Sequence, residues 1–176
     1  IIKLNYEPHW NPVLFRNNAG EIQLYFKSGE KISDWITWVM RSNDDGITWT
    51  KPEELVPNDN SGGRGPVKNK PVTLSNGTIA SPASVERDIW QAFVDLSSDG
   101  GYSWERSKFV PMDDILIKYK SKDCHFSLIQ PTLWESAPNQ VHMLLRSNNG
   151  FIYRSDSEDG GKNWCKAYAT ELPNNN

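Results

Sequence analysis

Six polar or charged residues recur at matched positions along the chain and could converge on one site. Three of them stand directly before a proline that opens an apolar run: Asn11, Lys70 and Gln130. Three others lie fifteen residues after those prolines, where the next apolar runs end: Lys27, Glu86 and Arg146. Because a packed core does not favour such side chains, we expect them to line a site where repeated units meet.

Arg146 and Glu86 carry the clearest chemistry of the six. Arg146 follows the apolar run 141–145, where an unpaired charge would be costly, and its guanidinium suits a carboxylate or vicinal hydroxyls. Glu86 is the only carboxylate among the six, which makes it the candidate catalytic acid/base, and Lys70 beside it would favour its ionised form. Glycoside hydrolysis normally needs a second catalytic group, which must then come from outside this chain.

The remaining candidates are expected to bind substrate. They are Lys70, Gln130, Asn11, Lys27, Lys68 and Arg64. Each has an alternative role that the sequence leaves open: solvation for the lysines, capping of strand ends for Asn11 and Gln130, and a mobile surface loop for Arg64.

Other chemistries fit the sequence poorly. Cys124 and His125 are adjacent, so on a strand they face opposite ways and cannot form a dyad. The three histidines lack the spacing of metal ligands, and two cysteines are too few for a disulfide scaffold. We therefore expect neither a metal nor another cofactor.

An eight-residue repeat, Ser-x-Asp-x-Gly-x-x-Trp, indicates the elements that position these residues. Its fixed residues are Ser42, Asp44, Gly46 and Trp49, then Ser97, Asp99, Gly101 and Trp104, then Ser157, Asp159, Gly161 and Trp164. Asp-Gly and Gly-Gly pairs favour tight hairpin turns, Ser and Asp side chains can bond the turn's backbone N–H groups, and the Trp can cover it. We interpret the motif as structural. A calcium loop is the alternative, but the acidic residue that would close it is missing.

The repeat predicts an all-β fold. Strands are expected before each motif, at 35–40, 89–96 and 151–154, and after each proline-led run, at 22–26, 78–85 and 141–145. Units of about four strands, approximately 8–56, 66–112 and 126–176, would be blades of a β-propeller within one domain, 1–176. A β-sandwich is the alternative, but it does not explain the repeat. Because propellers typically have about 4–8 blades, we expect the chain to be part of a longer protein, or to be completed by self-association.

The three motifs resemble the Asp-box of the sialidase superfamily, also called the bacterial neuraminidase (BNR) repeat. Further stretches resemble a sialidase-like glycoside hydrolase branch: Trp-Asn-Pro-Val-Leu-Phe (10–15), Gly-Pro-Val-Lys-Asn-Lys-Pro (65–71), Gln-Pro (130–131) and Thr-Glu-Leu-Pro-Asn (170–174). The resemblance spans nearly the whole chain. It implies a six-bladed parent propeller, of which this chain is about half.

The resemblance also implies a chemistry. Sialidases hold the substrate carboxylate with three arginines and use a Tyr nucleophile activated by a Glu, with an Asp as acid/base. Arg146 occupies the position of one arginine, and Gln130 stands where the family has its Glu. The first arginine and the Asp have no counterpart here, and the last arginine and the Tyr would lie beyond Asn176.

The amino-acid composition limits the classes of partner that the protein is expected to bind. Lys and Arg number 19 against 22 Asp and Glu, with no basic block, which argues against nucleic-acid binding. No apolar run approaches the ~20 residues of a membrane-spanning helix, and no charged-then-apolar leader opens the chain, so we expect a soluble protein.

The sequence thus predicts a fragment, inactive alone, of a glycoside hydrolase acting on a terminal sugar, acidic sugars among them, at the mouth of the central channel. A propeller that binds glycans without cleaving them, or one that binds proteins, is the alternative.

Overall fold

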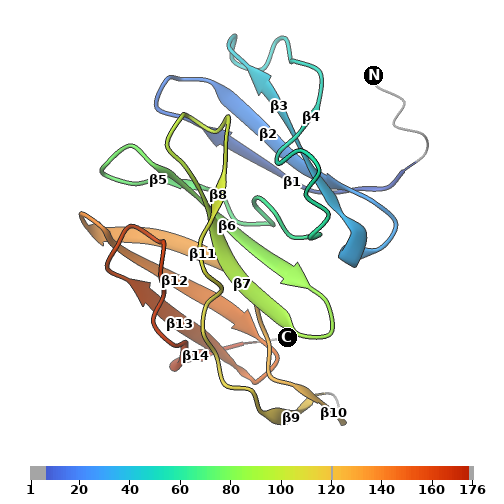
Figure 1. The fold of residues 1–176 in the computed structure, drawn as a ribbon, viewed down its shortest axis with the longest axis vertical. Helices are drawn as coiled ribbons and strands as arrows, with labels where there is room; N and C mark the ends of the chain where they lie inside the picture. The colour runs from blue at the N-terminus through green and yellow to red at the C-terminus, as the bar shows by residue number, and fades with distance from the viewer. Residues whose placement is uncertain (1–6, 120, 175–176) are drawn as a thin grey trace.

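In the computed structural model, which describes residues 7–119 and 121–174, the chain forms three antiparallel four-stranded sheets one after another (Figure 1). The first sheet contains β1 (His9–Arg16), β2 (Ile22–Ser28), β3 (Ile36–Ser42) and β4 (Glu53–Glu54). The second contains β5 (Val72–Thr73), β6 (Ile79–Glu86), β7 (Trp90–Ser97) and β8 (Glu105–Arg106). The third contains β11 (Leu128–Ala137), β12 (Gln140–Ser147), β13 (Phe151–Ser157) and β14 (Tyr168–Pro173). Strands follow sequence order within each sheet.

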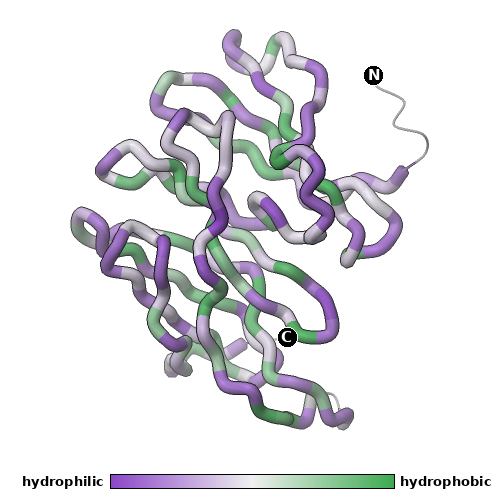
Figure 2. The backbone as a smooth tube through the Cα atoms, in the orientation of Figure 1, coloured by the Kyte–Doolittle hydropathy of each residue, from purple (hydrophilic) through white to green (hydrophobic). Residues whose placement is uncertain are grey.

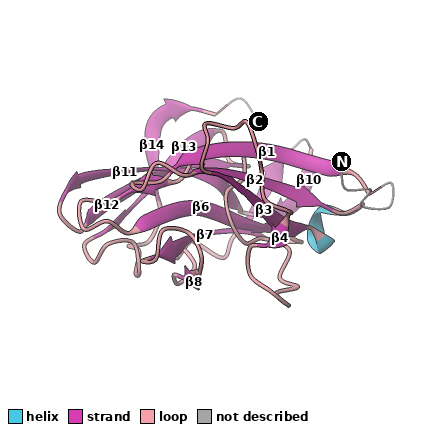
Figure 3. Cartoon of the chain, turned by 90° about the horizontal axis from the view of Figure 1, so that it is seen from above, coloured by secondary structure: helices cyan, strands magenta, loops and turns pink. Residues whose placement is uncertain are grey.

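These sheets confirm the predicted all-β class, and each predicted strand begins within one residue of an observed strand. Two elements have no counterpart in the prediction. One is the hairpin of β9 (Leu116–Tyr119) and β10 (Lys122–His125), between the second and third sheets. The other is a short 3-10 turn, η1 (Ile32–Asp34), which is the single helical element drawn in Figure 3.

Each Ser-x-Asp-x-Gly-x-x-Trp motif closes the turn between the third and fourth strands of its sheet. The Ser hydroxyl donates to the Asp carboxylate over 2.7–2.8 Å and accepts the N–H of the motif glycine over 2.8–2.9 Å. The indole N–H of Trp49 and of Trp104 donates back to the carbonyl of the motif glycine, over 3.0 and 3.1 Å. The motif therefore replaces ladder hydrogen bonds with side-chain bonds, as its residue types predict.

The second and third sheets pack through the largest apolar cluster. β11 lies against β6 and β7. The cluster includes Leu74, Ala80, Ala92, Val94, Leu96, Leu128, Leu133, Val141, Met143, Leu145 and Trp164. In Figure 2 apolar segments follow the strands and hydrophilic segments the turns. Burial of this cluster supplies the hydrophobic free energy that joins the two sheets.

The first sheet turns an apolar face away from the second. A hollow of about 710 Å³ on this face is lined by Trp10, Leu24, Phe26, Met40 and Trp49, among others. Trp10 is 43% exposed, which is unusual for so large an apolar side chain. The face is therefore an uncovered apolar surface in this chain.

Both cysteines are free, with Cys124 half-buried and Cys165 exposed. Within the described residues, no helix is long and apolar enough to cross a membrane.

The motif turns should make stability depend on acid pH. Hydrogen bonds from Ser103, Ser97 and Tyr102 outweigh burial and hold the pKa of Asp99 well below its ordinary value. A carboxylate with a lowered pKa stabilises the fold above its unfolded pKa, and this contribution is lost as pH falls toward the folded pKa. We expect Asp99→Asn to lower the free energy of unfolding at pH 7 by about 1–2 kcal/mol, and the difference from wild type to shrink below about pH 4.

Urea denaturation between pH 2.5 and 7 measures this effect. Glu158→Gln is the matched control, because Glu158 is exposed at a variable position of the third motif. An Asp99→Asn difference that stays constant across this pH range would contradict the assignment.

Candidate functional site

The predicted strand-end residues are not all in equivalent register. The motif serines pair across the sheets with Ile22, Ile79 and Val141. Five residues beyond these partners lie Lys27, Ser84 and Arg146. Glu86, which sequence counting placed in this set, lies two residues further along β6.

A shorter stretch between the proline and the turn accounts for this correction, because the turns 17–21 and 74–78 have the same length and the same backbone hydrogen bonds. Pro71 precedes Ile79 by eight residues, whereas Pro12 and Pro131 precede their equivalents by ten. Because side chains alternate with a period of two, Glu86 stays on the face that Ser84 occupies. Glu86 therefore projects beyond its neighbours, at the last position of β6.

Glu86 is half-buried among cations from the first sheet, the third sheet and the crossover before β5. Burial raises the pKa of its carboxyl, and the charges of Arg146, Lys68 and Lys27 with a hydrogen bond from Gln130 offset this only in part, so the pKa stays above its ordinary value. Lys68 and Lys70 are both exposed, and it is the charge of Lys68 that lowers the pKa of Glu86. The carboxyl can hold a proton to higher pH than a free Glu, as a general acid requires.

Gln130 joins Arg146 to Glu86. The Nη1 of Arg146 donates to the amide oxygen of Gln130 over 3.2 Å, and the Gln130 side chain lies near enough to Glu86 to lower the pKa of its carboxyl. An amide can bridge a guanidinium and a carboxyl in this way because it has both an acceptor oxygen and N–H donors. Gln130 is thus a connecting residue and cannot act as a base.

The backbone at Gln130 is strained, and hydrogen bonds from Asn69 hold it in place. Gln130 has φ of 52° directly before Pro131, within a bulge of β11, and Asn11 before Pro12 has φ of 49° within a bulge of β1. The side-chain amide of Asn69 donates to the carbonyls of Gln130 and Pro131, over 3.0 and 2.9 Å. Positive φ in residues other than glycine is uncommon and often marks a functional site.

Lys27 and Arg64 are occupied by protein contacts. Lys27 is fully buried and donates to Thr37 Oγ1 over 2.7 Å and to the carbonyl of Arg64, and burial lowers its pKa to about 7. The guanidinium of Arg64 binds Asp95 over 2.8 Å and Asp59 over 2.7 Å. These two residues, predicted to touch substrate, instead hold the crossover from the first sheet to the second.

Sequence reasoning missed Asp95 and Asn69. Asp95 is fully buried, and its Oδ2 also accepts the N–H of Gly65 over 2.7 Å. Its signal was a lone carboxylate inside the apolar run 92–96. Asn69 gave no such signal, because its target lies 61 residues away in sequence.

A hollow of about 450 Å³ opens beside Arg146. Its lining includes Lys68, Asn69, Gln130, Thr132, Arg146 and Asn174. Apolar side chains, among them Leu144, Ile152 and Leu172, line the rest of it. The size is that of a small-molecule site, and such a mixture of polar and apolar groups suits a sugar ring. Among the described residues, no group of three or more His, Cys, Asp or Glu side chains could hold a metal ion.

Residues 3–176 match the family model of the BNR repeat-like domain, and the chain therefore belongs to this family. No curated protein matches the sequence. Among solved structures, a protein of unknown function from Dyadobacter fermentans is 17% identical with a TM-score of 0.75, over 98% of this chain and 53% of its own. A Hadza microbial sialidase is 16% identical with a TM-score of 0.73, over 94% of this chain and 34% of its own.

An α-L-arabinofuranosidase from Fusarium graminearum is 16% identical with a TM-score of 0.67, over 92% of this chain and 48% of its own. These likenesses show the fold, a partial propeller of the sialidase type. The chain spans about half the length of the Dyadobacter protein and about a third of the microbial sialidase.

The Arg64–Asp95 pair yields a stability prediction. Arg64→Met would leave the buried Asp95 carboxylate without its main counter-charge, and we expect a loss of about 3–5 kcal/mol in the free energy of unfolding at pH 7. Burial already raises the pKa of Asp95 despite Arg64. Because a raised folded pKa makes ionisation destabilising, the loss should shrink as pH falls and Asp95 becomes protonated.

Denaturant unfolding at pH 7 and pH 5 tests this. The double variant Arg64→Met/Asp95→Asn is the matched control, because the amide removes the charge and can still accept the Gly65 N–H. An Arg64→Met chain as stable as wild type at pH 7 would show that the Arg64–Asp95 pair does not stabilise the crossover between the first two sheets.

Proposed function

We propose that the protein, as part of a longer chain, is a sialidase-like glycoside hydrolase that cleaves a terminal sugar at the channel mouth of the propeller. The observation that carries the proposal is the Glu86–Gln130–Arg146 arrangement at the strand ends of two neighbouring blades. A proton-holding carboxyl linked to a guanidinium suits protonation of a leaving-group oxygen next to a bound sugar.

The residues take separate roles in this proposal. Glu86 is the acid, and Arg146 and Lys68 bind sugar hydroxyls or a sugar carboxylate. Arg146 has five N–H donors, of which the described hydrogen bond uses one. Gln130 and Asn11 orient the ligand at the two bulges, with Lys70 as an outer contact, and Lys27 and Arg64 position the crossover.

The second catalytic group must come from blades outside these residues. Retaining and inverting glycosidases both need two such groups, and the chain offers Glu86 alone at the ring positions. The chain covers only about half of the matched structures, which is consistent with a second catalytic group in the part that it does not cover. We expect the 176 residues alone to be inactive.

A non-catalytic glycan-binding propeller is the second candidate. Gln130 favours it, because an amide stands where sialidases have the Glu that activates their nucleophile. The hollow beside Arg146 would serve either function.

The acid role of Glu86 is tested in the full-length chain. We expect Glu86→Gln to lower kcat by about 10²-fold or more, because the amide cannot donate the proton, while the glycan still binds within a few-fold. Release of sugar from aryl glycosides and from sialyl and arabinosyl substrates measures turnover, and Glu105→Gln, on the exposed β8, is the matched control.

Two outcomes would change the assignment. Unchanged turnover in Glu86→Gln would remove Glu86 from the mechanism. A wild-type protein that releases no sugar but binds glycans, and loses binding in Arg146→Ala, would establish the non-catalytic alternative.

Lys68 provides a pH test of the same site. Its charge lowers the pKa of Glu86, so Lys68→Met should raise that pKa further. A general acid acts when protonated, and activity therefore falls as pH rises through its pKa. The descending limb of the pH–rate profile should move to higher pH in Lys68→Met and stay in place in Lys70→Met; a shift in Lys70→Met alone would favour Lys70 as the neighbour of Glu86.

A further inference from the structure

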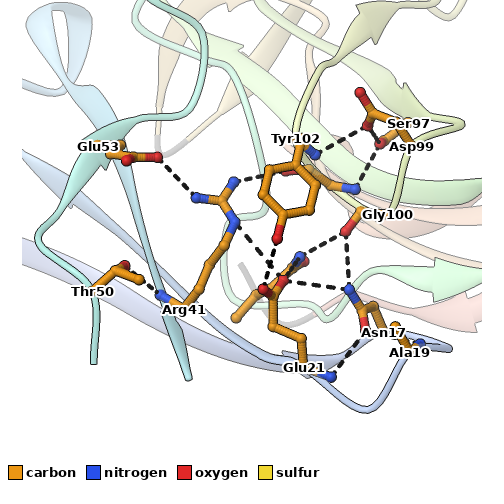
Figure 4. A network of polar contacts seen from close by, with 12 residues as sticks. Asn17, Ala19, Glu21, Arg41, Thr50, Glu53, Ser97, Asp99, Gly100 and Tyr102 are labelled. Carbon is orange, nitrogen blue, oxygen red and sulfur yellow. Dashed lines mark hydrogen bonds and ion pairs between the residues drawn. The ribbon is translucent and has the colours of Figure 1, made fainter. Parts of the chain in front are cut away.

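The motif turn of the second sheet is bound by polar side chains of the first (Figure 4). Asn17 and Gln23 donate through their amides to the carbonyl of Gly100, over 3.1 and 2.7 Å. Arg41 donates to the carbonyl of Gly101 over 3.0 Å. Three side chains thus recognise two successive backbone carbonyls of one turn.

This contact selects a glycine-rich turn. A Cβ on Gly101 would lie 2.7 Å from the amide atoms of Gln23, and Gly101 has φ of 99°. The Tyr102 hydroxyl donates to Glu21 over 2.9 Å, and the Arg41 guanidinium lies 4.5 Å from the Tyr102 ring centre. The motif Trp104 also packs on Tyr25 of the first sheet. The turn therefore fits the first sheet through its backbone and through two large side chains.

The motif turn of the third sheet also lies against the preceding sheet, here through an apolar contact and a backbone hydrogen bond. A Cβ on Gly161, in the third motif, would lie 3.6 Å from Leu96 of the second sheet. Leu96 directly precedes its motif serine, as Arg41 does in the first sheet. The N–H of Lys108 donates to the carbonyl of Lys162 in the third turn over 3.1 Å. Both motif turns that have a preceding sheet in this chain are thus seated on it.

The third sheet has an equivalent polar group, and no motif turn of residues 7–119 and 121–174 is seated on it. His142 pairs with Asp156 across β12 and β13, as Gln23 pairs with Arg41 across β2 and β3. Ser136 follows Pro131 by five residues, as Asn17 follows Pro12. We call Ser136, His142, Arg154 and Asp156 the third-sheet cradle.

The cradle is held in a fixed arrangement. His142 contacts Ser136 Oγ at 2.6 Å through Nε2 and Asp156 at 2.5 Å through Nδ1. Arg154 donates to Asp156 over 2.8 Å and stacks 5.3 Å from the Trp134 ring, which itself stacks on His142. Asp156 stands at the position of Arg41, and the guanidinium that it binds comes from Arg154, two residues earlier on the same strand and face.

We propose that the third-sheet cradle binds a further Ser-x-Asp-x-Gly-x-x-Trp turn, carried by a fourth four-stranded blade. Ser136 and Arg154 would donate to the carbonyls of the two glycine positions, as Asn17 and Arg41 do. The inference rests on the proposal that further blades complete the propeller, and it adds where and through which groups the next blade attaches.

The order Ser136–His142–Asp156 also matches a hydrolytic triad. Two observations favour the cradle. Arg154 Nη2 lies 3.0 Å from the same Nδ1 that faces Asp156, and so competes for the hydrogen bond that a triad needs. The equivalent first-sheet residues, Asn17, Gln23 and Arg41, already bind or frame a motif turn.

The probe is a cyclic peptide of residues 94–107 of this chain. Its ends are joined because the Ser107 N–H donates to the Val94 carbonyl over 2.8 Å in the folded hairpin. We expect saturable binding to the 176-residue chain with a dissociation constant of about 1 mM or below, followed by ¹H–¹⁵N NMR at the Trp134 indole and the Arg154 side chain.

Matched variants locate the contact. Arg154→Ala and His142→Ala should weaken binding by about fivefold or more, and Gly101→Val in the peptide should do the same, because its side chain would meet the cradle. Arg16→Ala, which removes an exposed residue of the first sheet, should leave binding unchanged.

Four results would overturn the proposal. They are no saturable shift with the cyclic peptide, shifts that lie away from β11–β13, binding unaffected by Arg154→Ala, and ester hydrolysis of p-nitrophenyl acetate that Ser136→Ala abolishes. Because the peptide titration involves neither a sugar nor Glu86, its failure would leave the glycosidase test standing. Equally, a failed glycosidase test would leave the cradle standing.

Discussion

The buried ion pair between Arg64 and Asp95 is the contact on which the arrangement of the site depends. It fastens the crossover between the first and second sheets at a point where Asp95 is fully enclosed. Such a pair adds little net stability over an apolar substitute, but it fixes position, because either partner alone would be a buried uncompensated charge. Lys27 secures the same crossover from the other side through the Arg64 carbonyl. With the crossover fixed, Lys68 reaches Glu86 and Asn69 reaches the strained peptide at Gln130.

The two interfaces between successive sheets use different physics. The second and third sheets meet through aliphatic side chains, which supply most of the burial. The first and second meet through amides and a guanidinium that donate to backbone carbonyls and through a carboxylate that accepts from Tyr102, which is a directional contact. The two outer faces of the chain repeat this contrast, with apolar residues outside the first sheet and the polar cradle outside the third. The two outer faces therefore differ in kind. The first sheet presents an apolar face, and the third presents the cradle, whose hydrogen bonds are directional.

Local patterns predicted the strands and the motif turns well, because both depend on residues close in sequence. Counting failed at Glu86, because Pro71 lies two residues closer to its turn than Pro12 does, and the sequence alone does not reveal this. It also favoured Lys70 over Lys68: Lys68 has φ of 63°, which breaks the strand alternation that the count assumed. Lys27 and Arg64 resemble surface cations in sequence, and their partners Thr37 and Asp95 lie 10 and 31 residues away. Such burial is set by tertiary packing, which no local pattern encodes.

The place of Glu86 at the last position of β6 has a consequence for how such proteins diversify. The second sheet keeps the register of the other two, since its motif serine still pairs with an aliphatic residue. A strand advances about 3.4 Å per residue, so a carboxyl two residues beyond Ser84 reaches about 7 Å further toward the rim on the same face. Position along a strand thus sets the reach of a side chain separately from the choice of residue. Within one repeated scaffold, a carboxyl can stand at the rim in one unit and a small hydroxyl below it in another, giving each unit a different share in a common site.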